Sequence, residues 1–295
     1  MIIDFIRGFF MALADSVPGV SGGTIAFLMG FFDKFINSLN YLMKGTKEER
    51  IKSIKFLAKI FVGWIVGMGL AVTILANLFD KEIYKMSSLF LGFIIAAIPV
   101  MIMEEKESVK GKYQNIIWAI IGAAAVILLS SLKMGSNLDL THLNIGMLVY
   151  IFIAGMLAIS AMVLPGISGS TILLSFGLYI PVINGVKDFL HFDFSSFALL
   201  FTLGLGILFG VATVLRLIKK LLDNYRSAIV YAIIGMMIGS LYAIVIGPTT
   251  LKVPQAAMTL KTFSIIFFII GVVIVLAFQQ VKNLPFYKKE LAKDE

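Results

Sequence analysis

The alternation of long apolar runs with short polar connectors predicts a chain that crosses a membrane several times. The apolar runs consist mainly of Ile, Leu, Phe, Val, Ala and Gly. A helix satisfies its own backbone hydrogen bonds in lipid, whereas a lone strand does not. We therefore expect an all-α polytopic membrane protein, with helices at 2–14, 21–43, 54–78, 86–103, 114–132, 145–164, 169–186, 196–221, 227–247 and 262–281.

Composition supports the membrane assignment and excludes several classes of function. The chain is 59% hydrophobic and only 14% charged, whereas soluble domains carry roughly 25% charged residues. The net charge of +8 does not indicate a nucleic-acid partner, because the cations are concentrated in a few short connectors. The chain has no cysteine, which excludes disulfides and thiolate metal sites. We expect neither a metal site nor a cofactor.

The distribution of Lys and Arg predicts which connectors face the cytoplasm. Cytoplasmic connectors of membrane proteins carry an excess of these residues. The excess predicts that both termini and the connectors 44–59, 104–113 and 216–226 are cytoplasmic, the signal in 104–113 being diluted by glutamates. It predicts that the other connectors face outward: 79–85, 133–144, 187–194 and 248–261.

The sequence contains an internal repeat. With a shift of 147 residues, thirteen positions between Phe5 and Asn37 meet identical residues between Phe152 and Asn184. With a shift of 143, four further positions match, among them Gly63 with Gly206. The repeat predicts two halves, 1–144 and 145–295, that together form one membrane domain.

The charge pattern predicts that the two halves are inverted in the membrane. The connector 44–59 is expected in the cytoplasm, whereas its counterpart 187–194 is expected outside. Each half then comprises a helix pair broken by Pro and Gly, expected to be re-entrant, plus three transmembrane helices. Inverted repeats with interrupted helices are typical of secondary transporters, whose substrate site lies near the midplane of the membrane.

The clearest part of the repeat is a polar motif inside apolar sequence. It reads "DSVPGVSGGTIAF" at 15–27 and "MVLPGISGSTILL" at 162–174. Proline ends a helix, glycine permits tight backbone, and a following Ser or Thr caps a new helix. The segment 2–14 is short for a span, which favours a re-entrant hairpin in the first copy, whereas 145–164 is long enough to cross.

A helix that starts inside the membrane directs backbone N–H groups and the positive end of its dipole into the protein, where they favour an anion such as phosphate. Two such starts predict a central anion cradle. The alternative is that the motif only breaks helices and lets them pack closely. Packing is our interpretation of the GxxxG pairs that begin at Gly63, Gly206 and Gly235. The predicted cradle residues are Pro18, Gly19, Ser21, Gly22, Gly23, Thr24, Pro165, Gly166, Ser168, Gly169, Ser170 and Thr171.

Two charged residues distinguish the first copy from the second. Arg7 and Asp15 have Ala154 and Met162 as their counterparts, and charges inside a membrane are functional candidates by default. Arg7 is a candidate for neutralising a phosphate, and Asp15 for carrying a coupling ion or pairing with Arg7. The alternatives are that Arg7 extends to the cytoplasmic surface and that Asp15 caps the next helix.

The two motif segments resemble those of the bacterial polyprenyl-phosphate transporter family, long catalogued as a domain of unknown function. The resemblance covers essentially the whole chain. It implies a flippase, and not an enzyme, that moves undecaprenyl phosphate from the outer to the inner leaflet by alternating access. This movement recycles the lipid carrier for peptidoglycan and other envelope polymers. The expected partners are polyprenyl phosphate, membrane lipids and a coupling proton or sodium ion.

Two other classes of function compete with this interpretation. The sequences "GVSG" and "GISG" match the G-x-S-G of rhomboid intramembrane proteases, but a serine nucleophile needs a nearby base. No histidine lies in an apolar segment. A small-anion channel, or an ion-coupled anion exchanger built on inverted repeats, is the alternative that stays open. A lateral opening to lipid favours the flippase, whereas an aqueous pore favours the channel.

Overall fold

The computed structural model describes residues 2–16, 20–71, 76–131, 144–166, 168–250, 254–285 and 287. Within these residues the secondary structure consists of helices, and no strand occurs. The expectation of an all-α protein is therefore confirmed.

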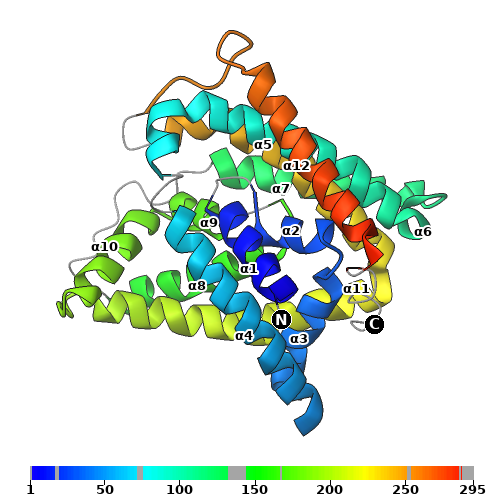
Figure 1. Ribbon diagram of the computed structural model, residues 1–295. Coiled ribbons are helices and arrows are strands. Elements are labelled where there is room, and N and C mark those ends of the chain that lie inside the picture. The colour runs from blue at the N-terminus through cyan, green and yellow to red at the C-terminus, as the bar shows by residue number, and fades with distance from the viewer. Residues whose placement is uncertain are drawn as a thin grey trace.

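Seven α-helices precede the described start of the second half (Figure 1). They are α1 (Ile2–Asp15), α2 (Gly22–Leu28), α3 (Phe32–Lys44), α4 (Lys47–Leu70), α5 (Ala76–Glu104), α6 (Lys106–Val109) and α7 (Ile116–Ser131). The helices after them are α8 (Ile145–Val163), α9 (Gly169–Ser175), α10 (Tyr179–Leu190), α11 (Phe197–Ile246) and α12 (Ile265–Asn283).

Among the described residues, six helices are long and apolar enough to cross a membrane: 47–70, 81–104, 113–131, 145–163, 197–249 and 265–283. Helix α11 has 50 residues, about 75 Å at 1.5 Å per residue, which is more than twice the ~30 Å of a hydrocarbon core. Its backbone leaves the helical region at Tyr225, where φ is −135° and ψ is 39°. In Figure 1 the parts before and after this break run in different directions. The two helices expected at 196–221 and 227–247 are therefore joined without a loop.

Two apolar segments expected as single helices are each divided in two, which corrects the prediction. Segment 21–43 forms α2 and α3, and segment 169–186 forms α9 and the start of α10, which meet at an angle of 112°. Gly30 and Gly177, at equivalent positions, have φ of 72° and 66°. Glycine adopts this left-handed conformation without a Cβ penalty and commonly ends helices there. The helix that begins within each motif is thus only seven residues long.

The helices before the motifs differ in length. Helix α1 has 14 residues, about 21 Å, and is too short to cross a hydrocarbon core of ~30 Å. Helix α8 has 19 residues and is among the candidate spans. Both lengths agree with the expectations for the two copies.

Close helix contacts recur at the spacings of the sequence repeat. A Cβ at Gly63 would overlap the carbonyl of Phe5, and a Cβ at Gly206 would overlap the carbonyl of Phe152. These contacts join α1 to α4 and α8 to the part of α11 before Tyr225. The three GxxxG pairs all lie against neighbouring helices, so their predicted packing role is confirmed.

The last long helix of each half packs against the other half. A Cβ at Gly92 of α5 would overlap the Phe268 carbonyl of α12, and one at Gly235 of α11 would overlap the Ala119 carbonyl of α7. These are again equivalent contacts. Each half therefore completes the helix packing of its partner half.

Ion pairs join three of the segments predicted to be cytoplasmic, namely 104–113, 216–226 and the C-terminal segment. Arg226 forms ion pairs with Asp33 and Glu105, and Lys282 forms one with Glu104. These pairs bring together α3, the end of α5, the break in α11 and the end of α12. In Figure 1, α6 and the C-terminal end lie on the side opposite α10.

Candidate functional site

The two copies of the motif are in direct contact inside the protein. The hydroxyl of Ser21 donates to the carbonyl of Leu164 at 2.9 Å. Gly23 lies directly on the second copy, because a Cβ there would overlap the carbonyl of Val163. Leu164 is the C-cap of α8, so the first copy satisfies a carbonyl left free by the helix break in the second.

In the first copy, two side chains cap the start of α2. Ser21 is the N-cap, and its Oγ accepts from the amide of Thr24 at 3.4 Å. The Oδ1 atom of Asp15 accepts from the amide of Gly22 at 2.6 Å. Asp15 therefore caps the next helix, as the alternative considered for it predicted.

The other carboxylate oxygen of Asp15 faces α4. Its Oδ2 atom accepts from the indole Nε1 of Trp64 at 3.0 Å, and only 9% of the residue is exposed. The hydrogen bonds of Asp15 thus come from Trp64 and a backbone amide rather than from Arg7. The predicted pairing of Arg7 with Asp15 does not occur in this structure.

In the second copy, hydroxyl groups cluster at the start of α9. Ser168 is the N-cap, and its Oγ accepts from the amide of Thr171 at 3.2 Å. The same Oγ lies 3.0 Å from the hydroxyl of Ser170 and 2.6 Å from that of Thr171. Gly166 has φ of 94°, and a Cβ there would lie 2.6 Å from the carbonyl carbon of Met236 in α11. This close approach explains the glycine.

The two copies differ in exposure. Residues 20–29 of the first copy are all buried, whereas Gly169, Ser170 and Thr171 of the second are partly exposed. Of the predicted cradle residues, Pro18 and Gly19 lie outside the described residues. Pro165 is buried beside Gly166.

Arg7 lies in a cluster of its own near the C-terminal end. Its side chain is fully buried, and its Nη1 donates to Asp4 at 3.1 Å. Its Nε donates to the hydroxyl of Tyr287 at 3.2 Å, and its guanidinium lies over the rings of Phe31 and Tyr287. Arg7 therefore does not extend to the surface, contrary to the alternative considered for it. Asp4 also pairs with Lys59 at 3.6 Å.

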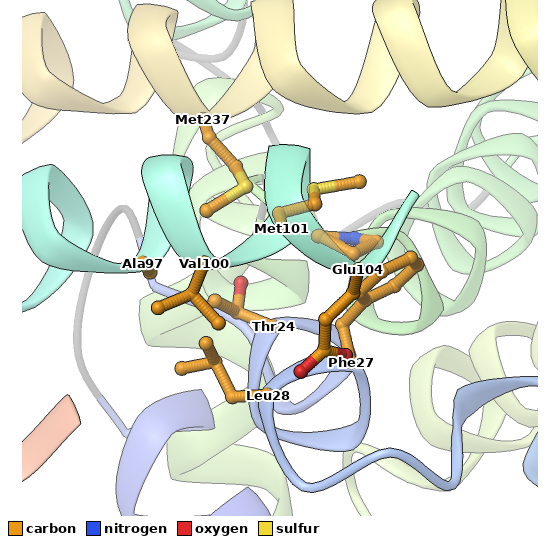
Figure 2. A pocket seen from close by; sticks show the side chains of 9 residues that line it. Thr24, Phe27, Leu28, Ala97, Val100, Met101, Glu104 and Met237 are labelled. Atoms are coloured by element: carbon orange, nitrogen blue, oxygen red, sulfur yellow. The ribbon is translucent and has the colours of Figure 1, made fainter. Parts of the chain in front are cut away.

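A narrow cavity adjoins the contact between the two motifs (Figure 2). Its free space is about 10 Å³, which is enough for a single water molecule. Two of the side chains that line it, Thr24 and Glu104, are polar, and the rest are apolar. The full lining consists of Thr24, Phe27, Leu28, Ala97, Val100, Met101, Glu104, Pro165 and Met237.

A second small gap adjoins the hydroxyl cluster of α9. It is lined by Ser130 of α7 together with Ser168, Thr171 and apolar neighbours. The Oγ of Ser130 is buried and has no hydrogen-bond partner among the described residues. Buried polar groups are normally satisfied, so this hydroxyl is a group that a ligand could engage.

Sequence reasoning missed several residues of this region. Asp4 lies one helical turn before Arg7, a spacing that indicates an ion pair on a helix. Four further residues contact the region from distant parts of the chain: Trp64, Ser130, Glu104 and Tyr287. No local pattern identifies them, because their positions depend on how helices pack.

An ion-pair network lies beyond the cavity, at the end of α5. Arg226 donates to Glu105 through Nε at 2.9 Å and to Asp33 through Nη2 at 2.9 Å. Burial alone would raise the pKa of Glu105, but hydrogen bonds and charge from Arg226 and a hydrogen bond from Ser108 outweigh it and hold the pKa below its ordinary value. Glu105 is therefore an ionised, mostly buried link between α5 and α11.

Together, these features define a multi-pass helical membrane protein with two interrupted helices in contact inside it. Comparisons with known proteins identify its family. Residues 11–262 match the family described as undecaprenyl phosphate translocase-like. The chain belongs to this family, whose members are transporters and not enzymes.

Two relatives support this assignment. A protein of Staphylococcus aureus named polyprenyl-phosphate transporter is 31% identical over 276 residues, which are 92% of this chain and 94% of that protein. A protein of Vibrio cholerae serotype O1 with the same name is 30% identical over 247 residues, which are 80% of this chain and 75% of that protein. No solved structure matches the chain.

Proposed function

We propose that this protein moves undecaprenyl phosphate from the outer to the inner leaflet of the bacterial plasma membrane. This movement returns the lipid carrier for the synthesis of peptidoglycan and other envelope polymers. The observation that carries the proposal is the direct contact between the two motifs through Ser21 and Leu164. Family membership and the names of the relatives support a lipid phosphate as the substrate.

The headgroup site in this proposal is formed by Pro18–Thr24 and Pro165–Thr171. A phosphate monoester carries negative charge that must cross a low-dielectric region, so it needs donors along its path. The hydroxyls of Ser168, Ser170 and Thr171 already form one cluster, and Ser130 adds a hydroxyl that lacks a partner among the described residues. Arg7 is a further cation that the proposal assigns to the headgroup, and in this structure Asp4 compensates its charge.

Transport in this proposal proceeds by alternating access between two inverted halves. The recurring glycine contacts at the repeat spacings support structural equivalence of the halves. The partial exposure of Ser170 and Thr171, against full burial of Ser21 and Thr24, suits a state in which one face of the site is open and the other closed. Rocking of the halves would exchange the open face.

We further propose that Asp15 carries the coupling ion. It is a buried carboxyl group of the first motif, and it accepts hydrogen bonds from the start of α2 and from Trp64 of α4. Protonation of such a group changes its hydrogen bonding to Gly22 and Trp64, which links the ion to the helix that the motif starts. Transport in an imposed proton or sodium gradient distinguishes the two ions.

The proposed function is tested by reconstitution into liposomes. The measurement is protein-dependent movement of undecaprenyl phosphate between leaflets, with Ser168→Ala and Thr171→Val alongside the unmodified protein. We expect transport by the unmodified protein and a loss of about tenfold in each variant, since a hydrogen bond to a charged group contributes about 1.5–3 kcal/mol. Folded protein that conducts small anions without moving lipid would instead support the anion channel.

A further inference from the structure

The cavity beside Thr24 is also lined by a member of an ion pair that neither motif contains. Glu104 lines the cavity, and 27% of its side chain is exposed. The other lining residues are buried, including Thr24 at 1% exposure and Met237 at 1%. Thr24 and Glu104 therefore line the same small cavity, and Glu104 lies at the end of α5, where α12 and the break in α11 meet.

Two donors from α12 converge on one oxygen of Glu104. The side-chain amide of Gln279 donates to Oε1 at 2.9 Å, and the ammonium of Lys282 pairs with the same oxygen. Gln279 and Lys282 lie one helical turn apart and share a face of α12. The side chain of Lys282 is only 15% exposed. Helix α12 thus presents a two-donor anion site, and the carboxylate of Glu104 occupies it.

We infer that Lys282 and Gln279 form a second phosphate site, which receives the headgroup at the cytoplasmic end of its path. Its ligand is the phosphomonoester group of a polyprenyl lipid, and Glu104 takes the place of that group while the site is empty. The inference deepens the proposed function and rests on it.

Charge compensation explains why Glu104 would occupy the place of the phosphate. A mostly buried ammonium without a partner is costly, so Glu104 stabilises Lys282 between transport events. A phosphate carries more negative charge than a carboxylate and competes for the same donors. The ligand leaves for the leaflet when Glu104 returns.

The walls of the cavity permit opening between the two sites. The side chains of Leu28, Met101 and Met237 lie between α2, α5 and α11 (Figure 2). Methionine is flexible and repacks easily. Separation of α2 from α5 would therefore connect Thr24 with Lys282 without breaking a helix.

A competing explanation is that Glu104 and Lys282 simply clamp α5 to α12. The two explanations differ in the effect of removing each partner on ligand binding. A clamp predicts that loss of either partner changes binding in the same direction. If Glu104 instead takes the place of the phosphate, the two changes affect binding in opposite directions. Removal of Glu104 frees the donors and strengthens binding, whereas removal of Lys282 destroys the site and weakens it.

The test measures binding of farnesyl phosphate, a short polyprenyl phosphate, to the purified full chain in nanodiscs. We expect Lys282→Ala to weaken binding about tenfold, since it removes a hydrogen bond to a charged group, and Lys282→Arg to restore most of it. We expect Glu104→Gln to tighten binding by about threefold or more. Lys219→Ala is the matched control, because Lys219 pairs with Asp223 elsewhere on the same end, and it should leave binding unchanged.

Inorganic phosphate is the second probe and distinguishes the source of the ligand. If Glu104→Gln tightens binding of inorganic phosphate but not of farnesyl phosphate, the site serves free phosphate and the assignment to a lipid headgroup is wrong. Equal weakening by Glu104→Gln and Lys282→Ala overturns the inference in favour of the clamp. Should Lys282→Ala fail to fold, Glu104→Gln decides alone, because unchanged or weaker binding contradicts the inference.

Liposome transport separates failure of this inference from failure of the proposed function. If the unmodified protein moves undecaprenyl phosphate while the two variants do not diverge in binding, only the second phosphate site is wrong. If the unmodified protein moves no undecaprenyl phosphate, the proposed function is wrong and the inference falls with it.

Discussion

Gly23 and Ser170 occupy equivalent positions in the two motifs, and their contacts explain why they differ. Gly23 lies on the backbone at Val163, where no Cβ fits. Ser170 is partly exposed and its hydroxyl joins Ser168. The glycine therefore permits contact between the copies, while the serine contributes a polar group to the site.

This difference predicts that Gly23→Ser damages the protein although the second copy carries serine naturally. The added side chain would force the motifs apart, and overpacking of this kind costs about 1–3 kcal/mol. Melting temperature in detergent and transport in liposomes should both fall. Gly204→Ala is the control, because nothing lies within 4 Å of a Cβ at Gly204. Equal melting temperatures for the two variants would contradict the contact.

Asp15 supports a second prediction at this scale. Asp15→Asn removes the ionisable group while preserving the size of the side chain, so we expect transport to lose its response to an imposed ion gradient. The measurement is leaflet movement in liposomes with and without a proton or sodium gradient. Asp193→Asn, in an exposed turn capping Ser195, should keep the response. Full gradient-dependent transport by Asp15→Asn would rule out the coupling role.

The end of α5 is the element on which the charged contacts converge. Glu104 forms an ion pair with Lys282 of α12. The adjacent Glu105 forms one with Arg226, which also pairs with Asp33 at the start of α3. Arg226 follows the backbone break at Tyr225. One helix end thus connects three other elements. Local sequence suggested only that 104–113 had a mixed charge.

The lowered pKa of Glu105 makes this connection sensitive to acid. A carboxyl group whose pKa is lower in the folded state adds stability above its unfolded value and loses it as the pH falls through the folded value. We therefore expect melting temperature to drop below the ordinary pKa of 4.5. Glu105→Gln should have a lower melting temperature at neutral pH and a smaller drop in acid. A pH profile parallel to that of the unmodified protein would contradict this role.

At the scale of the whole molecule, the two halves exchange helices. Helix α12 packs on α5, and α7 packs on the part of α11 after Tyr225. The halves therefore share one helical core rather than forming two separate domains. Inverted orientation of the halves is a separate proposal that this packing supports.

The inverted orientation predicts opposite sidedness for equivalent connectors. Glu48 lies in the connector 44–59, Ser195 directly follows the counterpart 187–194, and both are exposed. The chain has no cysteine, so single Glu48→Cys and Ser195→Cys variants can be labelled selectively. In intact cells, a membrane-impermeant thiol reagent should label Ser195→Cys and not Glu48→Cys. Inside-out vesicles should give the reverse, and labelling of both from one side would exclude inversion.

Much of the fold follows from periodicity and composition alone. Apolar runs require helices in lipid, and the GxxxG pairs predicted positions of close helix packing. The contacts of Asp15 and Arg7 did not follow. Both are charges in the same short helix, but Asp15 meets Trp64 and Arg7 meets Tyr287. Those partners are distant in sequence, so only packing brings them near.

The sequence by itself determined that this is a helical membrane protein with a duplicated Pro, Gly and hydroxyl motif, because these properties depend on residue type and spacing. The tertiary structure decided that the two motifs touch, that Gly30 and Gly177 divide helices, and that Glu104 meets α12. These outcomes depend on the distance between helices. That distance is set by side chains and carbonyls far apart in the chain, which no local pattern records.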